Sequence, residues 1–307
     1  MAHVTSLNDV QLEQSSLVTI GVFDGVHLGH QHLIRALVER AKASGQLTVV
    51  LTFFPHPDTI LRELTGRYYL TTPEQRAEQL HRLGVDTVIT QTFDEAFRHT
   101  SAQAYITQLC DRLKMTELWV GQHFALGYER EGDVTFLSRL GEDNGYTVHA
   151  IELVADANHH VISSTSIRAL LQEGKVEQVT GLLGRPFAVA GEVVRGDQRG
   201  RTIGFPTANL AVWDEQVLPA YGVYAGWATV DGVLHPAVTN VGVRPTFDGQ
   251  RMAIETHLLD FDDDLYGKVL NLSFDFRLRG ERKFEGITAL VAQIHADVEA
   301  GRALLAR

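Results

Sequence analysis

This chain of 307 residues has a single cysteine, no excess of basic residues and no long apolar run. Cys110 is the only cysteine, which excludes an intrachain disulfide and fits a reducing compartment. The formal net charge is -11, and an acidic chain argues against generic binding to nucleic acid or anionic membranes. No apolar run approaches the roughly 20 residues of a membrane helix, and residues 1–17 lack the pattern of a secretory signal. We therefore expect a cytoplasmic protein that acts on small molecules, with no obligate protein partner evident.

The first part of the chain alternates apolar, strand-like runs with amphipathic, helix-like runs. A length of 307 residues exceeds one ordinary compact domain, so we expect two domains. Strands are expected at residues 18–22, 47–54, 85–93, 117–124 and 146–154, and helices at residues 32–44, 72–84, 101–113 and 135–145. Thr72 is a candidate N-cap, with Pro73 at the first helical position and Gly84 as the stop. This alternation predicts an α/β fold with a mainly parallel sheet.

The second part of the chain has a different pattern of helix-like and strand-like runs. Residues 163–184 predict two short helices, and short β-rich runs separated by Gly, Asp and Pro turns follow. That spacing predicts an antiparallel barrel or sandwich, closed by a helix over about residues 287–305. We place the boundary after Gly184, which gives domains of residues 1–184 and 185–307.

The segment "GVFDGVHLGH" is the first candidate for chemistry. Gly21 and Gly25 permit a tight turn after a strand, and His27 and His30 lie three residues apart where a helix begins. Backbone N–H groups and the positive helix end favour an anion there, and two imidazoles can donate to phosphate oxygens. A His-x-x-His pair is also a common metal pair, and isolated histidines often have no chemical role. The preceding strand and the Gly-rich turn favour a phosphate site here.

This segment closely resembles the His-x-Gly-His signature of the α/β nucleotidyltransferases, in the form found in the prokaryotic bifunctional riboflavin kinase/FMN adenylyltransferase (FAD synthetase) family. The stretches "FFPHP", "VGQHFALGYEREGD" and "ISSTSIR" are similar to three further motifs of that family. The resemblance implies a flavin contact at His56, although a rigid turn role for this residue stays open. His123 and Ala125 depart from the family, which usually has aspartate and often has arginine at these positions. The family resemblance implies that His27 and His30 are catalytic. It also implies that ATP is bound by Gly21, Phe23, Asp24, Gly25, His27, Gly29, His30, Ser164, Thr165 and Arg168.

A second candidate, "RGDQRGRTIGFPTANL", joins a Gly/Arg-rich loop to a turn at residues 206–209. Small residues let backbone N–H groups approach phosphates, while Thr207 and Asn209 offer neutral oxygens that suit Mg²⁺. No Gly-x4-Gly-Lys-Ser/Thr sequence is present, so a Walker-type kinase is not expected. Taken alone, the charged run is also typical of a solvated hairpin.

The motifs "GRTIGFPTAN", "TNVGVRPTF", "IETHLLDFDDDLYG" and "LRGERKFEG" resemble those of riboflavin kinases in order and approximate spacing. The resemblance implies a six-stranded antiparallel β-barrel with a C-terminal helix, behind a Rossmann-like HxGH nucleotidyltransferase domain. It implies Mg-ATP bound by Gly204, Thr207 and Asn209, with Thr207 and Asn209 on the metal, and Glu255 as the general base. It places Asn240, Arg244 and Arg279 beside the flavin, although each also has a purely structural alternative.

The resemblance implies two reactions. Residues 185–307 would phosphorylate riboflavin with ATP to give FMN, and residues 1–184 would transfer AMP from a second ATP to FMN, giving FAD and pyrophosphate. Other HxGH nucleotidyltransferases lack the "GFPTAN" and "ETHLLDF" part, and aminoacyl-tRNA synthetases carry a Lys-Met-Ser-Lys-Ser-type loop that is absent here. A flavin-binding module that has lost one activity is the remaining alternative, because of His123.

Overall fold

The computed structural model describes residues 1–152, 161–196, 200, 203–246 and 249–306. Contacts between residues divide the chain into two compact units. Unit 1 comprises Met1–Thr65 and Tyr69–Ser164, and unit 2 comprises Gly66–Tyr68 and Thr165–Arg307. The functional boundary expected after residue 184 stays a prediction, and each unit is described by itself.

Unit 1 is built on a parallel sheet of six strands in the order β1-β4-β3-β2-β5-β8. The strands are β1 (Ala2–Val4), β2 (Ser16–Ile20), β3 (Leu47–Phe54), β4 (Thr87–Thr92), β5 (Met115–Gly121) and β8 (Thr147–Ile151). Every neighbouring pair is parallel. The expected α/β fold with a parallel sheet is confirmed, and the bounds of β3 coincide with those expected from its apolar run. The short strand β1 was not expected, because three residues carry too little pattern to predict a strand.

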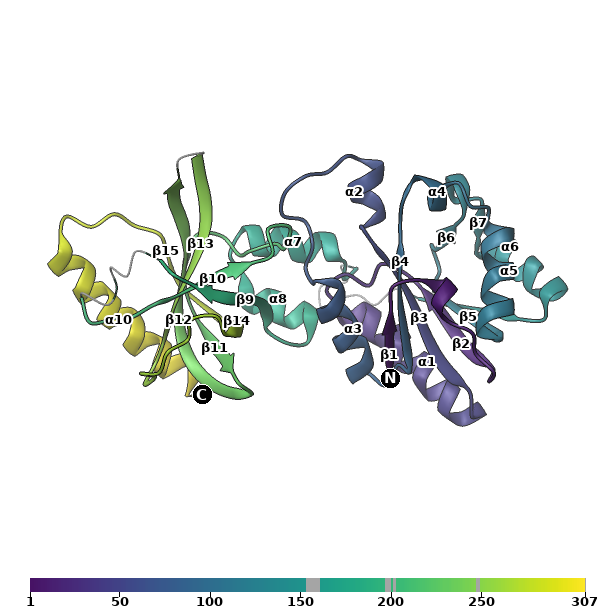
Figure 1. Cartoon of the computed structure of the whole chain (residues 1–307), viewed down its shortest axis with the longest axis horizontal. Coiled ribbons are helices and arrows are strands. Elements are labelled where there is room, and N and C mark those ends of the chain that lie inside the picture. The colour runs from purple at the N-terminus through teal and green to yellow at the C-terminus, as the bar shows by residue number, and fades with distance from the viewer. Residues whose placement is uncertain (153–160, 197–199, 201–202, 247–248, 307) are drawn as a thin grey trace. The chain divides into compact units, whose positions relative to one another are not determined.

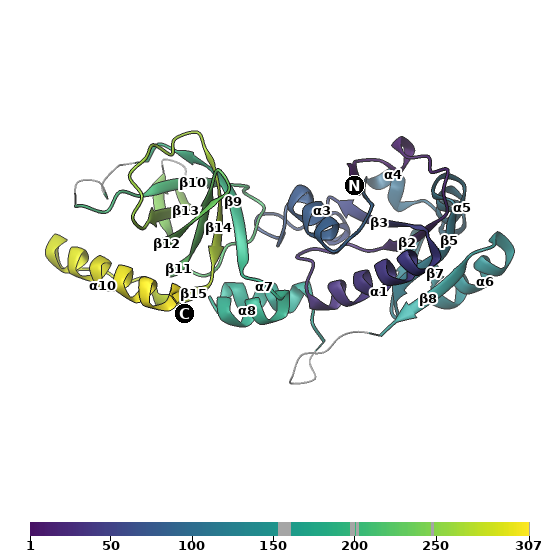
Figure 2. The same cartoon turned by 90° about the horizontal axis from the view of Figure 1, so that it is seen from below.

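Helices cover both faces of this sheet (Figures 1 and 2). They are α1 (Leu28–Ser44), α2 (Pro57–Leu61), α3 (Pro73–Arg82), α4 (Glu95–Arg98), α5 (Ala102–Leu113) and α6 (Val134–Asn144), with a small hairpin of β6 (Ala125–Leu126) and β7 (Gly132–Asp133) before α6. Val50 of β3 packs with α1 and α3, while its neighbours Val49 and Leu51 pack with α5 and α6. Successive strand residues point to opposite faces, so a continuous apolar run such as β3 buries both sides. The expected Thr72 N-cap and Pro73 start of α3 are confirmed, with a reciprocal capping box to Gln75.

Unit 2 contains a closed antiparallel barrel that follows two helices. Its elements are α7 (Ser164–Gln172, with Ser164 in unit 1), α8 (Val176–Leu183), β9 (Phe187–Val194), β10 (Ala208–Val212), β11 (Gly222–Val230), β12 (Val233–Thr246), β13 (Gly249–Leu258), β14 (Val269–Phe274), β15 (Phe276–Gly280) and α10 (Ile287–Leu305). The ladder β12-β13-β10-β9-β14-β11 closes through pairing of β11 with β12. Strand β15 continues β14 after Asp275 and pairs with the other end of β11. The expected six-stranded barrel with a C-terminal helix is confirmed.

Arg277 of β15 joins the α7–α8 turn to the barrel. Its Nη1 donates to the Glu173 carbonyl at 2.8 Å, and its Nη2 donates to the Tyr221 carbonyl at 3.1 Å. The guanidinium lies against Gly174, whose φ is +74° and whose position would bring an added Cβ within 2.6 Å of Arg277 Nη1. Glycine at this turn therefore serves both the backbone conformation and the close approach of Arg277. The backbone N–H of Arg277 also donates to Glu177 of α8 at 3.0 Å.

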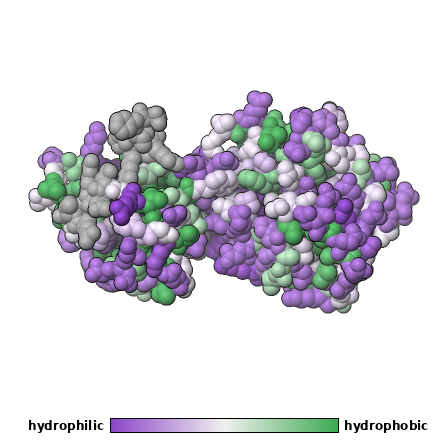
Figure 3. Space-filling view, in the orientation of Figure 1, coloured by the Kyte–Doolittle hydropathy of each residue, from purple (hydrophilic) through white to green (hydrophobic). Residues whose placement is uncertain are grey.

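The face of the molecule drawn in Figure 3 has a mixed exterior. On the face drawn in Figure 3, hydrophilic residues predominate and hydrophobic ones occur in small scattered groups. Among the residues that the structure describes, no helix combines the length and the apolar character needed to span a bilayer. Isolated apolar side chains on a surface are normal and mark no site by themselves.

We expect Arg277→Ala to lower the free energy of unfolding of unit 2 by about 2 kcal/mol, because two hydrogen bonds from a charged group to carbonyl oxygens are lost. Urea unfolding followed by tryptophan fluorescence measures this, since Trp213 and Trp227 lie in unit 2. Arg302→Ala is the matched control. Arg302 makes an exposed bidentate pair with Asp260, so its loss should cost less than about 1 kcal/mol. Equal losses in the two variants would show that Arg277 is no more than a surface contact.

Candidate functional site

His27 and His30 meet at the first turn of α1. His27 is the N-cap, and its Nδ1 accepts a hydrogen bond from the backbone N–H of His30 at 3.3 Å. The two imidazoles are stacked, with ring centroids 3.6 Å apart and an interplanar angle of 18°. The first turn of α1 contains no acidic residue. An N-terminus with this composition offers an anion both the helix dipole and side-chain donors.

Small residues shape the loop before α1. A Cβ at Gly29 would lie 3.1 Å from Cε1 and 3.2 Å from Nδ1 of His27, so a side chain there would displace that ring. Gly25 has a φ of +81°, as expected for the tight turn, but Phe23 and Val26 also have positive φ, at 51° and 40°. Phe23 packs edge-on against His30 at 5.1 Å between centroids. The strained turn is therefore shared with two apolar residues whose burial holds it.

A buried ion pair lies beneath this loop. The carboxylate of Asp24 accepts hydrogen bonds from the backbone N–H groups of Leu70 and Thr71, at 3.0 to 3.1 Å, and from the Thr71 hydroxyl at 3.2 Å. Arg76 Nη2 lies 3.7 Å from Asp24 Oδ1, and the two side chains are 0% and 1% exposed. Arg76 Nη1 also donates to Thr52 Oγ1 at the end of β3, at 2.9 Å. The pair thus ties the loop after β2 to the end of β3 and to the segment before α3.

Burial sets the ionisation of His30. Its Nδ1 is buried, although the residue as a whole is only half-buried. Burial, then the neighbouring His27 and then Arg76 hold the pKa of His30 well below the ordinary value of 6.5. His30 is therefore neutral near pH 7. A neutral imidazole can act as a hydrogen-bond donor without holding a fixed positive charge at the site.

The "ISSTSIR" segment spans the end of unit 1 and the start of unit 2. Ser164 Oγ donates to the carbonyl of Asp24 at 2.8 Å, which brings this residue to the histidine loop. Thr165 is exposed. Arg168 Nε donates to the Tyr68 carbonyl at 2.6 Å, and its guanidinium lies 4.0 Å from the centroid of the Tyr68 ring. Contact of Thr165 and Arg168 with ATP stays a prediction.

In unit 2, three polar residues form one row across neighbouring strands. Glu255 of β13 lies opposite Asn209 of β10 on one side and opposite Asn240 of β12 on the other. Residues directly opposite in an antiparallel ladder share a face of the sheet. This is the outer face that also bears Val238, which packs with α10, while Thr256 points into the barrel with 0% exposure. Asn209 and Glu255, predicted from separate motifs, are thus brought side by side.

The segment before β10 is fixed by an aromatic anchor. Gly204 has a φ of +89°, and Phe205, the next residue, is 7% exposed in a cluster with Val223, Val238 and Val298. The expected turn at residues 206–209 is wrong in its second half, because β10 begins at Ala208 and Asn209 is a ladder residue. Pro and Asn are typical turn residues, but pairing of β10 with β9 and β13 outweighs that preference here. Residues 197–199 and 201–202 of the Gly/Arg-rich loop lie outside the described residues.

The residues expected at the flavin have varied surroundings. His56 caps α2, with its Nδ1 accepting a backbone N–H at 3.0 Å. Asn240 lies in the polar row, and Arg244 lies in β12 with its side chain outside the described residues. Arg279 forms a bidentate ion pair with Asp297 of α10, at 2.8 to 3.0 Å. This ion pair gives Arg279 a structural role between β15 and α10, and its contact with the flavin stays a prediction.

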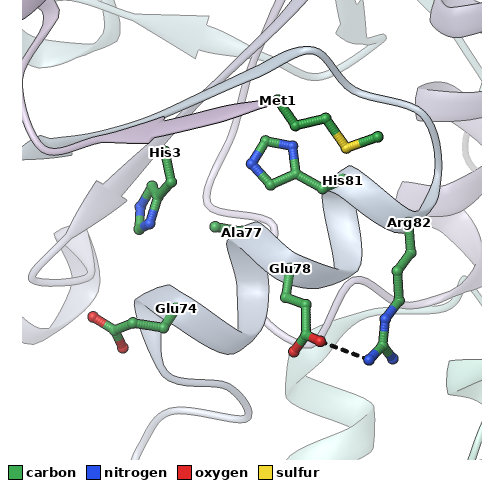
Figure 4. Close-up of a pocket in the computed structure, with 7 residues that line it drawn as sticks. All are labelled: Met1, His3, Glu74, Ala77, Glu78, His81 and Arg82. Carbon is green, nitrogen blue, oxygen red and sulfur yellow. Dashed lines mark hydrogen bonds and ion pairs between the residues drawn. The ribbon is translucent and has the colours of Figure 1, made fainter.

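A cavity of about 420 Å³ between β1 and α3 lies outside these two groups of residues (Figure 4). Its walls are Met1, His3, Glu74, Ala77, Glu78, His81 and Arg82. Glu78 and Arg82 pair with each other at 2.6 Å, and His3 shares a hydrogen bond with Thr90 at 2.9 Å. This cavity contains none of the residues that the sequence motifs select.

Comparison with known proteins gives both halves a family. A family model described as FAD synthetase matches residues 9–166, and one described as riboflavin kinase matches residues 183–305. A bifunctional riboflavin kinase/FMN adenylyltransferase of Listeria monocytogenes is 36% identical over 99% of this chain and 97% of its own. The enzymes of the same name from Pseudomonas fluorescens and Escherichia coli K12 are 39% and 37% identical, covering 100% and 93% of this chain and 98% and 91% of theirs.

The chain belongs to the bifunctional riboflavin kinase/FMN adenylyltransferase family. It is an enzyme of FMN and FAD biosynthesis, as the resemblance implied. A solved structure from Streptococcus pneumoniae, described as a macrolide-efflux protein, has the same fold, with a TM-score of 0.88 and 30% identity over 98% of both chains.

Three residues of this enzyme were not selected from sequence. They are Arg76, Thr71 and Asp297. Their importance depends on partners distant in sequence, at Asp24 and Arg279, which no local pattern reveals. A capping box at Thr72 was the one local sign that the segment before α3 is fixed.

We expect Arg76→Met to destabilise unit 1 by about 3–5 kcal/mol, because it leaves the buried Asp24 carboxylate without its cation. FAD formation should fall with it, while FMN formation in unit 2 should persist. Arg40→Met is the control: Arg40 also pairs with a carboxylate of unit 1, Glu117, but its side chain is 51% exposed. Thermal unfolding and separate assays of both products test this. Wild-type stability in Arg76→Met would contradict the tie between the loops.

The lowered pKa of His30 predicts how stability depends on pH. Below about pH 6.5 the unfolded state binds a proton at this residue, and the folded state does not, until the pH reaches the lower folded pKa. Stability should therefore fall as the pH drops below 6.5, by up to about 1.4 kcal/mol per pH unit from this residue. His30→Asn should show a shallower loss. Urea unfolding of both proteins between about pH 5.5 and 7.5 measures the difference, and parallel curves would contradict burial of a neutral His30.

Proposed function

We propose that the two reactions of the family are divided between the two groups of residues described above. The loop before α1 would transfer AMP from ATP to FMN, giving FAD and pyrophosphate. The polar row on β10, β12 and β13 would transfer the γ-phosphoryl group of ATP to riboflavin, giving FMN and ADP. The observation that supports the first assignment best is the stacked His27–His30 pair at the N-terminus of α1. The reducing compartment suggested by a single cysteine fits a cytoplasmic enzyme.

For adenylyl transfer, the chemistry follows from the tautomers of the two histidines. Because His27 Nδ1 accepts the backbone N–H of His30, its hydrogen lies on Nε2, which makes Nε2 the donor toward a phosphate oxygen. His30 is neutral and stacked on it. A phosphate oxygen of FMN attacks the α-phosphorus, and pyrophosphate leaves in line. The imidazoles and the end of α1 stabilise the charge that spreads over the phosphate oxygens. Gly21, Phe23, Asp24, Gly25 and Gly29 would frame the nucleotide through the shape of the loop, and Ser164, Thr165 and Arg168 would bind its phosphates.

For the kinase reaction, Glu255 is proposed as the general base. It would take the proton from the terminal ribityl hydroxyl as that oxygen attacks the γ-phosphorus. Its register beside Asn209 supports this role, because base and phosphate ligands must lie close together. Asn240 on its other side would contact the flavin, as would His56 at the adenylylation site, with Arg244 and Arg279 as further flavin contacts.

The oxygens at the start of β10 suit Mg²⁺. Thr207 and Asn209 supply neutral oxygen donors, which hard divalent cations accept. In the described part of the chain, no group of three or more His, Cys, Asp or Glu side chains could hold a metal ion by itself. A metal here would therefore share its coordination between Thr207, Asn209 and the phosphates of ATP. When bound, it would neutralise phosphate charge.

A pair of reciprocal variants tests the division. Purified enzyme is incubated with ATP and Mg²⁺ and either riboflavin or FMN, and riboflavin, FMN and FAD are resolved by chromatography. We expect His30→Ala to reduce FAD formation at least about 100-fold with FMN formation retained, from loss of charge stabilisation. Glu255→Gln should reduce FMN formation by about 100-fold or more, with FAD formation retained when FMN is supplied. Loss of both products in one folded variant would overturn the division, and absence of both in the wild type would overturn the function.

A further inference from the structure

His257 lies beside the proposed phosphate ligands but has no role in the two reactions so far. It follows Glu255 by two residues on β13, so both residues lie on the outer face of the barrel. The register pairs Ala208 with Thr256 and Asn209 with Glu255. One step further along this antiparallel ladder, His257 falls opposite Thr207.

The imidazole of His257 is bonded to the peptide that leads into Thr207. Its Nδ1 is 2.8 Å from the carbonyl oxygen of Pro206. A carbonyl oxygen can only accept, so Nδ1 must carry a hydrogen in this arrangement. The bond fixes the plane of the peptide between Pro206 and Thr207, and with it the direction in which the Thr207 side chain leaves the backbone.

Phe205 fixes the other end of the same short segment. Its ring lies edge-on to His257, at 5.6 Å between centroids, and edge-on to His295 of α10, at 4.7 Å. Its side chain is buried in the cluster that joins α10 to the barrel. The segment therefore has an apolar anchor at Phe205 and a polar one at the Pro206 carbonyl, immediately before Thr207.

We propose that His257 is a positioning residue of the kinase reaction, which holds the Pro206–Thr207 peptide by donating from Nδ1 and so places the Thr207 hydroxyl for Mg-ATP. The inference rests on the proposed role of Thr207. His257 itself touches no reacting atom. Since it lies on the same strand and face as Glu255, it also sets the spacing between the proposed base and the phosphate ligands. Its loss should weaken Mg-ATP binding more than riboflavin binding.

The test compares three substitutions of His257 in the full chain. His257→Leu removes the donor, His257→Ala removes the donor and the contact with Phe205, and His257→Asn offers an amide N–H close to the position of Nδ1. We expect the KM for Mg-ATP in FMN formation to rise roughly tenfold in His257→Leu and His257→Ala, with a smaller change in the KM for riboflavin. His257→Asn should recover most of the loss.

Two controls separate the alternatives. His235→Leu removes a different histidine of the barrel that also packs edge-on against a phenylalanine, Phe261, at 4.9 Å, and its kinase kinetics should match the wild type. Urea unfolding followed by the fluorescence of Trp213 and Trp227 reports whether unit 2 is folded in each variant. Equal impairment of His257→Asn and His257→Leu, or an unchanged KM for Mg-ATP in His257→Leu, would overturn the inference. Thr207→Ala separates failure of the proposed Mg-ATP site from failure of the positioning role of His257. Normal kinase activity in Thr207→Ala would overturn the proposed site itself. Impaired activity in Thr207→Ala together with normal activity in the His257 variants would overturn only the role of His257.

Discussion

The arrangement of the first candidate site depends on one buried ion pair, between Arg76 and Asp24. Both charges are withdrawn from water, and such a pair is tolerated only when the remaining hydrogen-bonding capacity is also satisfied. Asp24 accepts hydrogen bonds from backbone and hydroxyl donors at Leu70 and Thr71, and Nη1 of Arg76 donates to the Thr52 hydroxyl and to the Phe53 carbonyl. The same contacts connect three segments at the carboxyl ends of neighbouring parallel strands, where α/β sheets place their ligands. The loop that carries the stacked histidines is therefore held by an ion pair that cannot separate without leaving a charge in an apolar interior.

In the barrel, the candidate residues lie on the outer face, where Asn209 is buried and Asn240 and Glu255 are half-buried. Its polar row lies on the outer surface, so the residues there depend on what covers that surface. Phe205 and α10 pack over Val238 on the same outer face, and the Arg279–Asp297 pair fixes the helix to β15. The candidate side chains are thus held in different ways in the two units, with a buried charge pair in one and an external helix in the other. Each way suits its scaffold, because a closed barrel of this size has an interior filled by side chains.

Much of this could be predicted from the sequence. The apolar run of β3, the cap of α3 and the helix α10 were predicted within a residue or two, because local pattern alone decides them. The motifs also selected residues that the fold brings together, such as Asn209 and Glu255. What could not be predicted were long-range partners. No sequence pattern around Arg76 predicts its pairing with Asp24. Likewise, no pattern around Ala208 predicts that a Pro-Thr-Ala-Asn segment enters a strand. Positive φ at Phe23 was equally invisible, since it is held by packing against His30.

The anchoring of Phe205 by α10 also has a consequence for the order of events on the ribosome. The segment before β10 emerges well ahead of His295 and Val298, which cover its aromatic ring. Domains generally fold as units while the chain is being made, so the parallel sheet and its histidine loop can mature while Phe205 still lacks its cover. The half proposed for the second reaction is thus complete first during synthesis. The half proposed for the first reaction is completed only when α10 has been made. The two halves are therefore completed in the reverse of the order in which a riboflavin molecule would use them.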